Sequence, residues 1–190
     1  MNNIQVNDFI WKIEGFACED YCKKIIDVSK NDLLKSDVLG KKKKSRDSST
    51  AFLSSKSHPF LNELDEAVAN LCGKPVSNQE DLSVVRYNVN GYYAPHFDFF
   101  KEDSDYYKRE TKIGGQREFT FILYLNDVEE GGATSFPLLD LQFKPKLGDA
   151  ILFKNLIDKS PNHISLHAGL PVLKGEKWIA VKWVRENKMT

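Results

Sequence analysis

Short apolar segments separated by turns fill the chain from about residue 81 to its end, and this rhythm restricts the fold more than any other feature. Candidate strands cover residues 83–88, 96–100, 118–125, 134–136, 141–143, 150–153, 165–168 and 177–184. Between them lie the turn signals Asn90-Gly91, Gly114-Gly115, Gly131-Gly132, Gly148-Asp149 and Lys174-Gly175. Many short strands with regular turns and no helices between them predict a double sheet, either a β-sandwich or a β-barrel.

The first 80 residues have a different pattern. Between residues 20 and 34, apolar residues recur with the spacing of an amphipathic helix. A second helix is expected from Ser57-His58-Pro59 to Cys72, where Gly73 and Pro75 end it, and a strand is expected at residues 50–53. We therefore predict an α+β chain that is mainly β. Its helices lie within about residues 1–80, its double sheet covers about 81–190, and the whole forms one domain.

Charge and hydropathy limit the classes of partner. The chain has 190 residues, with 27 Lys plus Arg and 27 Asp plus Glu, so its net charge is zero. This balance gives no support for a nucleic-acid or anionic-membrane partner, and it favours a monomer. No apolar stretch reaches the roughly 18 residues that a membrane span needs. The N-terminal residues lack the pattern of a secretory signal, so the expected location is the cytoplasm.

Two further features have simple interpretations. Cys18, Cys22 and Cys72 are too few, and odd in number, for a disulfide framework, so we expect free thiols. The polar run at residues 41–47 begins with four lysines. We interpret it as a solvated loop, with a basic docking patch as the alternative.

The segment Tyr92-Tyr93-Ala94-Pro95-His96-Phe97-Asp98 carries the first chemical signal. In a strand, residues two apart face the same side, so His96 and Asp98 are expected to point together into the barrel. One imidazole and one carboxylate are two of the three ligands of a facial triad that holds iron(II). For the third ligand we choose His167, which lies in a predicted strand, over His163, which follows a turn-like stretch.

The last predicted strand contains a possible buried cation. By alternation, Lys177 shares one face with Ile179, Val181 and Trp183. A lysine on a core face needs an anionic partner, which a dicarboxylate ligand such as 2-oxoglutarate would supply. In the reversed register, Lys177 and Lys182 both lie near solvent at the strand ends, and the strand alone does not decide between the two registers.

Several motifs in order make the chain closely resemble the collagen-type prolyl 4-hydroxylases. They are Tyr87, His96-Phe97-Asp98, Gly114-Gly115-Gln116-Arg117, Glu129-Glu130-Gly131-Gly132-Ala133-Thr134, His167-Ala168-Gly169-Leu170-Pro171-Val172, Gly175-Glu176-Lys177-Trp178 and Lys182-Trp183. The resemblance runs from about residue 83 to the end. It also includes Arg46-Asp47-Ser48-Ser49-Thr50, which is similar to an Arg-x-Ser-Ser segment of that family.

This resemblance implies a double-stranded β-helix, or jelly roll, with flanking N-terminal helices. It implies that His96, Asp98 and His167 bind iron(II), and that Lys177 binds the distal carboxylate of 2-oxoglutarate. The positions that match further cosubstrate contacts are Tyr87 and Thr134, and Trp183 matches a pocket-lining tryptophan. Tyr93 and Arg117 match positions near the peptide substrate.

The implied reaction is hydroxylation of peptidyl proline, with O₂ and 2-oxoglutarate as cosubstrates and ascorbate as reductant. Related oxygen-sensing enzymes use an arginine nine residues after the second histidine, whereas here that position is Glu176 and the cation is Lys177. This favours the collagen-like or plant-like group, in the compact form known from microbes, algae or viruses, with a proline-rich peptide as substrate. The alternatives are an oxygenase that acts on another residue or small molecule, and a non-catalytic barrel that binds proline-rich peptides.

Overall fold

The computed structural model describes residues 2–36 and 45–189, so the lysines at the start of the polar run fall outside the described residues. The strands are β1 (Asn2–Asn7), β2 (Ile10–Glu14), β3 (Leu34–Lys35), β4 (Arg46–Asp47), β5 (Ser49–Leu53), β6 (Leu82–Tyr87), β7 (Tyr92–His96), β8 (Arg117–Tyr124), β9 (Glu130–Gly131), β10 (Thr134–Phe136), β11 (Leu141–Phe143), β12 (Ala150–Lys154), β13 (Leu156–Ile157), β14 (Ser160–Pro161), β15 (His167–Gly169), β16 (Val172–Lys174) and β17 (Lys177–Arg185). The α-helices are α1 (Glu19–Ser29), α2 (Asn62–Cys72) and α3 (Tyr107–Thr111). Short 3₁₀ helices are η1 (Lys30–Asp32), η2 (Pro59–Leu61), η3 (Val76–Asn78), η4 (Pro137–Leu139) and η5 (His163–Ser165).

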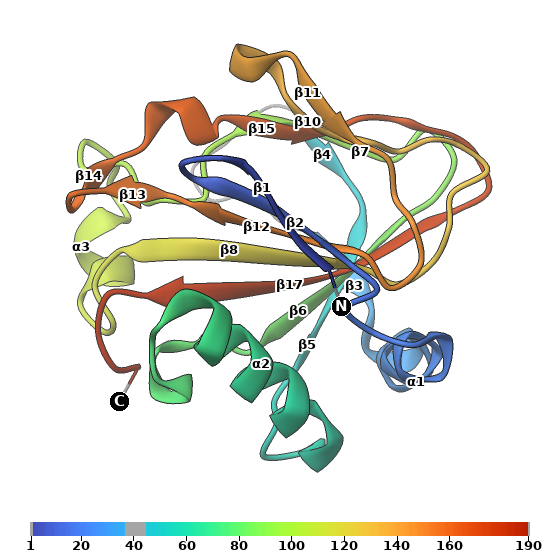
Figure 1. Ribbon diagram of the computed structural model, residues 1–190, viewed down its shortest axis with the longest axis horizontal. Helices are drawn as coiled ribbons and strands as arrows, with labels where there is room; N and C mark the ends of the chain where they lie inside the picture. Colours follow the sequence, from blue (N-terminus) through green and yellow to red (C-terminus); the bar gives the residue numbers. More distant parts are fainter. Residues whose placement is uncertain (1, 37–44, 190) are drawn as a thin grey trace.

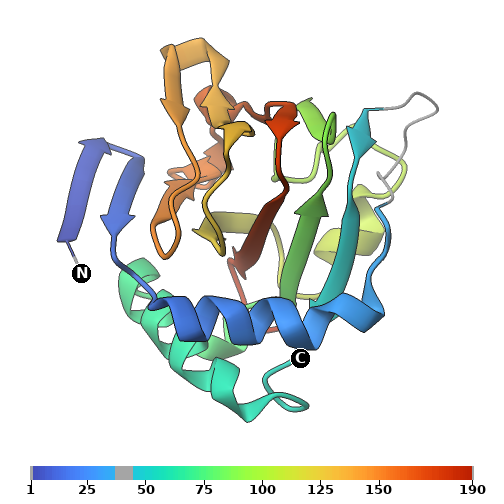
Figure 2. The same ribbon diagram turned by 90° about the vertical axis from the view of Figure 1, so that its right-hand side faces the viewer.

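Two antiparallel sheets face each other. The larger has the order β1-β2-β12-β8-β17-β6-β5-β3, and the smaller has the order β11-β10-β15-β7-β4. In Figure 1 the smaller sheet lies above the larger sheet, and α1 and α2 lie below the larger sheet. Figure 2 shows the two helices crossing beneath the strands. A mainly β chain with its two longer helices in the first 80 residues confirms the predicted class.

The larger sheet separates two apolar cores. On its lower face, side chains of α1 and α2 such as Ile25 and Val68 pack against strand residues such as Phe121 and Ala180. On its upper face, Phe136 of the smaller sheet joins a second cluster made mostly by residues of the larger sheet. The central strands are therefore apolar on both faces, which is why their segments appear as nearly continuous apolar runs.

The helix predictions need small corrections, and one hairpin was missed. Helix α1 ends at Ser29 and is followed by η1, so the predicted helix over 20–34 is too long at its end. Helix α2 ends as predicted, because Gly73 adopts φ 62° and its N–H donates to the carbonyl of Ala69. The hairpin of β1 and β2 was not predicted, because β1 is exposed along most of its length and has no strong apolar alternation.

The predicted strand over 96–100 is wrong in its bounds. The strand is β7, which ends at His96, and the chain then bends. Phe100 does not continue a strand ladder, because the Gln116 side chain donates to its carbonyl (2.6 Å) and accepts from its N–H (2.8 Å). Phe99 and Phe100 are buried, which draws the chain inward after the bend.

Within the described residues, no helix has both the length and the apolar character that crossing a membrane requires.

A buried ion pair joins α2 to β17. The Nζ of Lys182 lies 2.7 Å from Oδ1 of Asp65, and both side chains are 4% exposed. Removing one partner from such a pair leaves an uncompensated buried charge, whereas replacing both with apolar side chains is often neutral.

We therefore expect Lys182→Met to lower the free energy of unfolding by about 3–5 kcal/mol, because Asp65 loses its counter-ion. The double variant Asp65→Leu/Lys182→Met should be clearly more stable than the single one. Denaturant unfolding of the three proteins measures both effects. A single variant as stable as the wild type would show that the pair has no structural role.

Candidate metal centre

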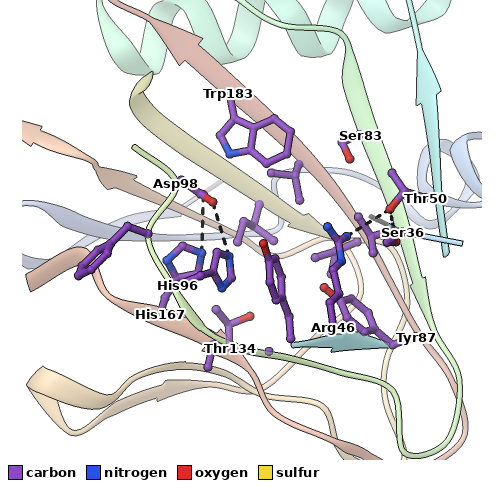
Figure 3. Close-up of a pocket in the computed structure, with 18 of the residues that line it drawn as sticks. Ser36, Arg46, Thr50, Ser83, Tyr87, His96, Asp98, Thr134, His167 and Trp183 are labelled. Carbon is purple, nitrogen blue, oxygen red and sulfur yellow. Dashed lines mark hydrogen bonds and ion pairs between the residues drawn. The ribbon is translucent and has the colours of Figure 1, made fainter. Parts of the chain in front are cut away.

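Three side chains from the smaller sheet and its adjoining bend converge on one point. His96 is the last residue of β7, His167 is the first of β15, and the antiparallel register pairs them directly. Asp98 follows in the bend after β7. Its Oδ1 lies 3.6 Å from Nε2 of His96 and its Oδ2 lies 3.6 Å from Nε2 of His167. The ligand atoms of all three residues lie within 4.8 Å of one another, and Figure 3 shows both imidazoles facing the carboxylate.

Backbone carbonyls orient both imidazoles. The Nδ1 of His96 donates to the carbonyl of Ala94 at 2.9 Å, and the Nδ1 of His167 donates to that of Ser165 at 3.0 Å. Each ring therefore presents Nε2, the nitrogen without the proton, to the centre. This is the arrangement in which metal-ligating histidines are usually held.

The charges of the centre suit a divalent cation. Burial, together with the neighbouring His167, lowers the pKa of His96 to about 3. Burial by itself would raise the pKa of Asp98, but His167, His96 and Arg117 outweigh it and lower the pKa to about 2. At neutral pH His96 is thus neutral and Asp98 ionised, the forms in which these side chains bind metal. Two imidazoles and one carboxylate are the donor set of non-haem iron(II) oxygenases, so the residues present fit iron(II).

Lys177 lies deep in the same cavity. Its side chain is among the largest that are fully buried, its Nζ is 3.5 Å from Oγ1 of Thr134, and no carboxylate of the described residues pairs with it. Thr134 Oγ1 also accepts from the hydroxyl of Tyr124 at 2.9 Å. Burial without an acidic partner lowers the pKa of Lys177 to about 7. The register in which Lys177, Ile179 and Val181 face the interior is therefore confirmed. The reversed register, which placed Lys177 and Lys182 near solvent, is wrong because both side chains are buried.

The remaining predicted site residues form the walls. The ring of Tyr93 stacks on His96 with 3.5 Å between centroids, and the guanidinium of Arg46 lies over Tyr93. Arg117 stacks on the ring of Trp183 at 3.6 Å and donates twice to Glu80, both at 2.7 Å. A cavity of about 640 Å³ is lined by all nine predicted site residues: Tyr87, Tyr93, His96, Asp98, Arg117, Thr134, His167, Lys177 and Trp183.

Comparison with known proteins identifies the family. The sequence model of the 2OG-Fe(II) oxygenase superfamily matches residues 82–185, more than half of the chain. The chain belongs to this superfamily.

Within it, the proteins similar to this chain include prolyl hydroxylases. A protein of Acanthamoeba polyphaga mimivirus assigned as a prolyl 4-hydroxylase is 39% identical over 171 residues, covering 89% of this chain and 71% of that protein. The Arabidopsis thaliana protein named probable prolyl 4-hydroxylase 10 is 33% identical over 200 residues, covering 92% of this chain and 68% of that one. The crystal structure of the viral collagen prolyl hydroxylase from Paramecium bursaria Chlorella virus-1, as its 2OG complex, matches with a TM-score of 0.77 and 30% identity. It covers 94% of this chain and 97% of that one. The predicted resemblance and the jelly-roll core are thereby confirmed.

Glu176, which occupies the position of the arginine in the oxygen-sensing enzymes, points elsewhere in this oxygenase. Its Oε2 accepts from Nε of Arg86 at 2.8 Å, and its side chain is 44% exposed. The cation inside the cavity is therefore Lys177, the residue that follows Glu176 in the sequence, as the spacing predicted.

Sequence reasoning missed two buried side chains behind the metal centre, Thr120 and Asn155. Thr120 Oγ1 donates to Asp98 Oδ2 at 2.7 Å, and Asn155 Nδ2 donates to Thr120 Oγ1 at 2.8 Å. A polar residue in the apolar segment Phe119-Thr120-Phe121 was the available signal. His163, the rejected ligand, is exposed and contacts Phe97 and Phe99 edge-on, away from the cluster.

We expect His167→Ala and Asp98→Ala to lose Fe(II) binding, because each removes one of three converging ligands. His163→Ala is the matched control and should bind Fe(II) like the wild type. Anaerobic equilibrium dialysis against Fe(II) measures this directly. If His163→Ala lost Fe(II) binding and His167→Ala kept it, the third ligand would be His163 and not His167.

Proposed function

We propose that the protein hydroxylates prolyl residues in a peptide or protein, using iron(II), 2-oxoglutarate and O₂. The observation that carries this proposal is one cavity that holds both the His96–Asp98–His167 cluster and an uncompensated buried lysine, Lys177. Family membership supports the oxygenase chemistry, and the named relatives support proline as the target.

In this proposal, His96, Asp98 and His167 hold the iron and Lys177 holds the distal carboxylate of 2-oxoglutarate. The bound metal and cosubstrate together activate O₂ for insertion into a C–H bond, while 2-oxoglutarate is converted to succinate and CO₂. Thr134 adds a hydroxyl beside Lys177, and the buried ring of Tyr87 closes the same end of the cavity. The protein supplies the orientation and a buried amine, that of Lys177, which would be charged when it pairs with the cosubstrate.

The aromatic walls support a proline-rich substrate. The aromatic residues that line the cavity include Tyr93, Trp183, Phe97, Phe99 and Tyr106. Peptides in the polyproline II conformation dock on aromatic-lined grooves at small ordering cost. We infer that Tyr93 and Arg117 flank the target proline, with Arg117 held in place by Glu80.

Three finer parts of the proposal rest on the sequence. Ascorbate as reductant follows from the family resemblance. A monomeric state follows from the charge balance and stays a prediction, and a cytoplasmic location also stays a prediction. The three cysteines are free thiols in the structure.

The decisive experiment measures succinate from 2-oxoglutarate with Fe(II) and ascorbate, with and without a proline-rich peptide. We expect the peptide to stimulate succinate production and to gain one oxygen on proline, as measured by mass spectrometry. Succinate that forms only with another substrate would keep the oxygenase and replace proline. No succinate from the iron-loaded protein under any condition would instead favour a non-catalytic peptide-binding barrel.

The low pKa of Lys177 generates a second prediction. At pH 8 the amine of the ligand-free protein is mostly neutral, since its pKa is about 7, and binding of a dicarboxylate should raise that pKa. Binding of 2-oxoglutarate to the Fe(II)-loaded protein should therefore take up close to one proton more at pH 8 than at pH 6. Anaerobic calorimetry in buffers of different ionisation enthalpy measures this uptake.

Lys177→Arg is the control, because a guanidinium stays protonated throughout this range. It should lose the extra uptake at pH 8 even where it still binds 2-oxoglutarate. Equal uptake in both proteins would show that Lys177 is not the group that changes protonation.

A further inference from the structure

The Asp98 carboxylate is fixed from behind by a fully buried hydrogen-bond chain. Thr120 on β8 and Asn155 directly after β12 are both 0% exposed. Asn155 Nδ2 donates to Thr120 Oγ1 at 2.8 Å, and Thr120 Oγ1 donates to Asp98 Oδ2 at 2.7 Å. The second distance is in the range of a charge-assisted hydroxyl–carboxylate bond.

The direction of this chain is fixed at both ends. An amide N–H only donates, so the Thr120 oxygen must accept from Asn155. An ionised carboxylate only accepts, so the single hydroxyl hydrogen of Thr120 must point to Asp98. Asn155 thus removes the rotational freedom that a threonine hydroxyl otherwise has.

The position of Asp98 explains why such a chain is needed. His96 and His167 belong to paired strands, whereas Asp98 lies in the bend beyond the end of β7. Its bond to Thr120 ties the bend to β8, a central strand of the larger sheet.

Asn155 is itself held by two backbone bonds. Its N–H donates to the carbonyl of Glu118, and its carbonyl accepts from the N–H of Asn162, both at 2.8 Å. The carbonyl of Asn162 in turn accepts from the N–H and hydroxyl of Ser165, whose carbonyl orients His167. One connected network therefore reaches two of the three converging side chains.

We propose that Thr120 and Asn155 are positioning residues of the metal centre. Thr120 holds the Asp98 carboxylate facing the two imidazoles, and Asn155 fixes the direction of the Thr120 hydroxyl. This inference rests on the proposed metal centre and adds to it two residues that touch neither metal nor substrate.

The test is Fe(II) affinity, measured by anaerobic dialysis without 2-oxoglutarate or peptide, so that it is independent of hydroxylation. Thr120→Val keeps the shape and removes the hydroxyl, and we expect it to bind Fe(II) about 10–100-fold more weakly. Thr120→Ser keeps the hydroxyl and should bind close to the wild type. Asn155→Leu should weaken binding less than Thr120→Val, because the hydroxyl can still reach Asp98.

A double-mutant cycle separates this chain from a general structural effect. Because the Asn155 side chain reaches Asp98 only through Thr120, and its backbone bonds are kept in Asn155→Leu, this substitution should have no further effect on affinity in the Thr120→Val background. Circular dichroism of the metal-free proteins verifies folding. Should Thr120→Val not fold, Thr120→Ala, which also lacks a side-chain donor, takes its place.

Wild-type affinity in folded Thr120→Val, or in Thr120→Ala if that variant is used, would overturn the proposal. Additive effects of the Thr120 and Asn155 substitutions would also overturn it. A wild-type protein that binds no Fe(II) would overturn the metal centre and this inference with it. Strong Fe(II) binding with the expected pattern, but no proline hydroxylation, would leave this inference standing and overturn only the proposed substrate.

Discussion

Two buried lysines on opposite faces of strand β17 decide how the molecule is organised. The strand lies in the middle of the larger sheet, covered by helices on one face and by the smaller sheet on the other. A charge in either layer is costly unless it is paired. Lys182 is paired with Asp65 of α2, whereas Lys177, on the cavity face, has no acidic partner among the described residues. The fold satisfies one charge internally and leaves the other facing the cavity, which is why we propose Lys177 as the contact for an anionic cosubstrate.

The candidate metal centre lies on two paired strands of the smaller sheet and on the bend where that pairing ends. Pairing of β7 with β15 brings His96 and His167 together through backbone register alone. Asp98 has no such ladder and is held by a side-chain hydrogen bond from Thr120 of the larger sheet. The centre therefore connects both sheets, which keeps the two imidazoles and the carboxylate in one geometry before any metal binds.

The cavity has a polar, charged end and an aromatic end. Lys177 lies beside Thr134 at the first, with 3.5 Å between Nζ and Oγ1, while Arg117 stacks on Trp183 at the second. Arg117 is anchored by Glu80, which also accepts from Arg185, and Arg185 donates to carbonyls at Ile113 and Gly115. The aromatic end is thus tied to the segment that follows α3. Such a division lets a charged cosubstrate and an uncharged proline ring occupy different regions of one cavity.

The sequence by itself left two registers open for β17, but it determined the β-rich architecture and the histidine and aspartate candidates. These follow from alternation, from turn residues and from motif spacing, all of which are local along the chain. The exact place of β7, the β1–β2 hairpin and the support of Asp98 by Thr120 and Asn155 were decided only by the tertiary structure. Each depends on contacts between residues far apart in sequence, such as Gln116 with Phe100 and Asn155 with Thr120. A local sequence pattern does not show where a side chain takes the place of a neighbouring strand. The bend after His96 and the hydrogen-bond partner of Asp98 therefore depend on how the two sheets pack together.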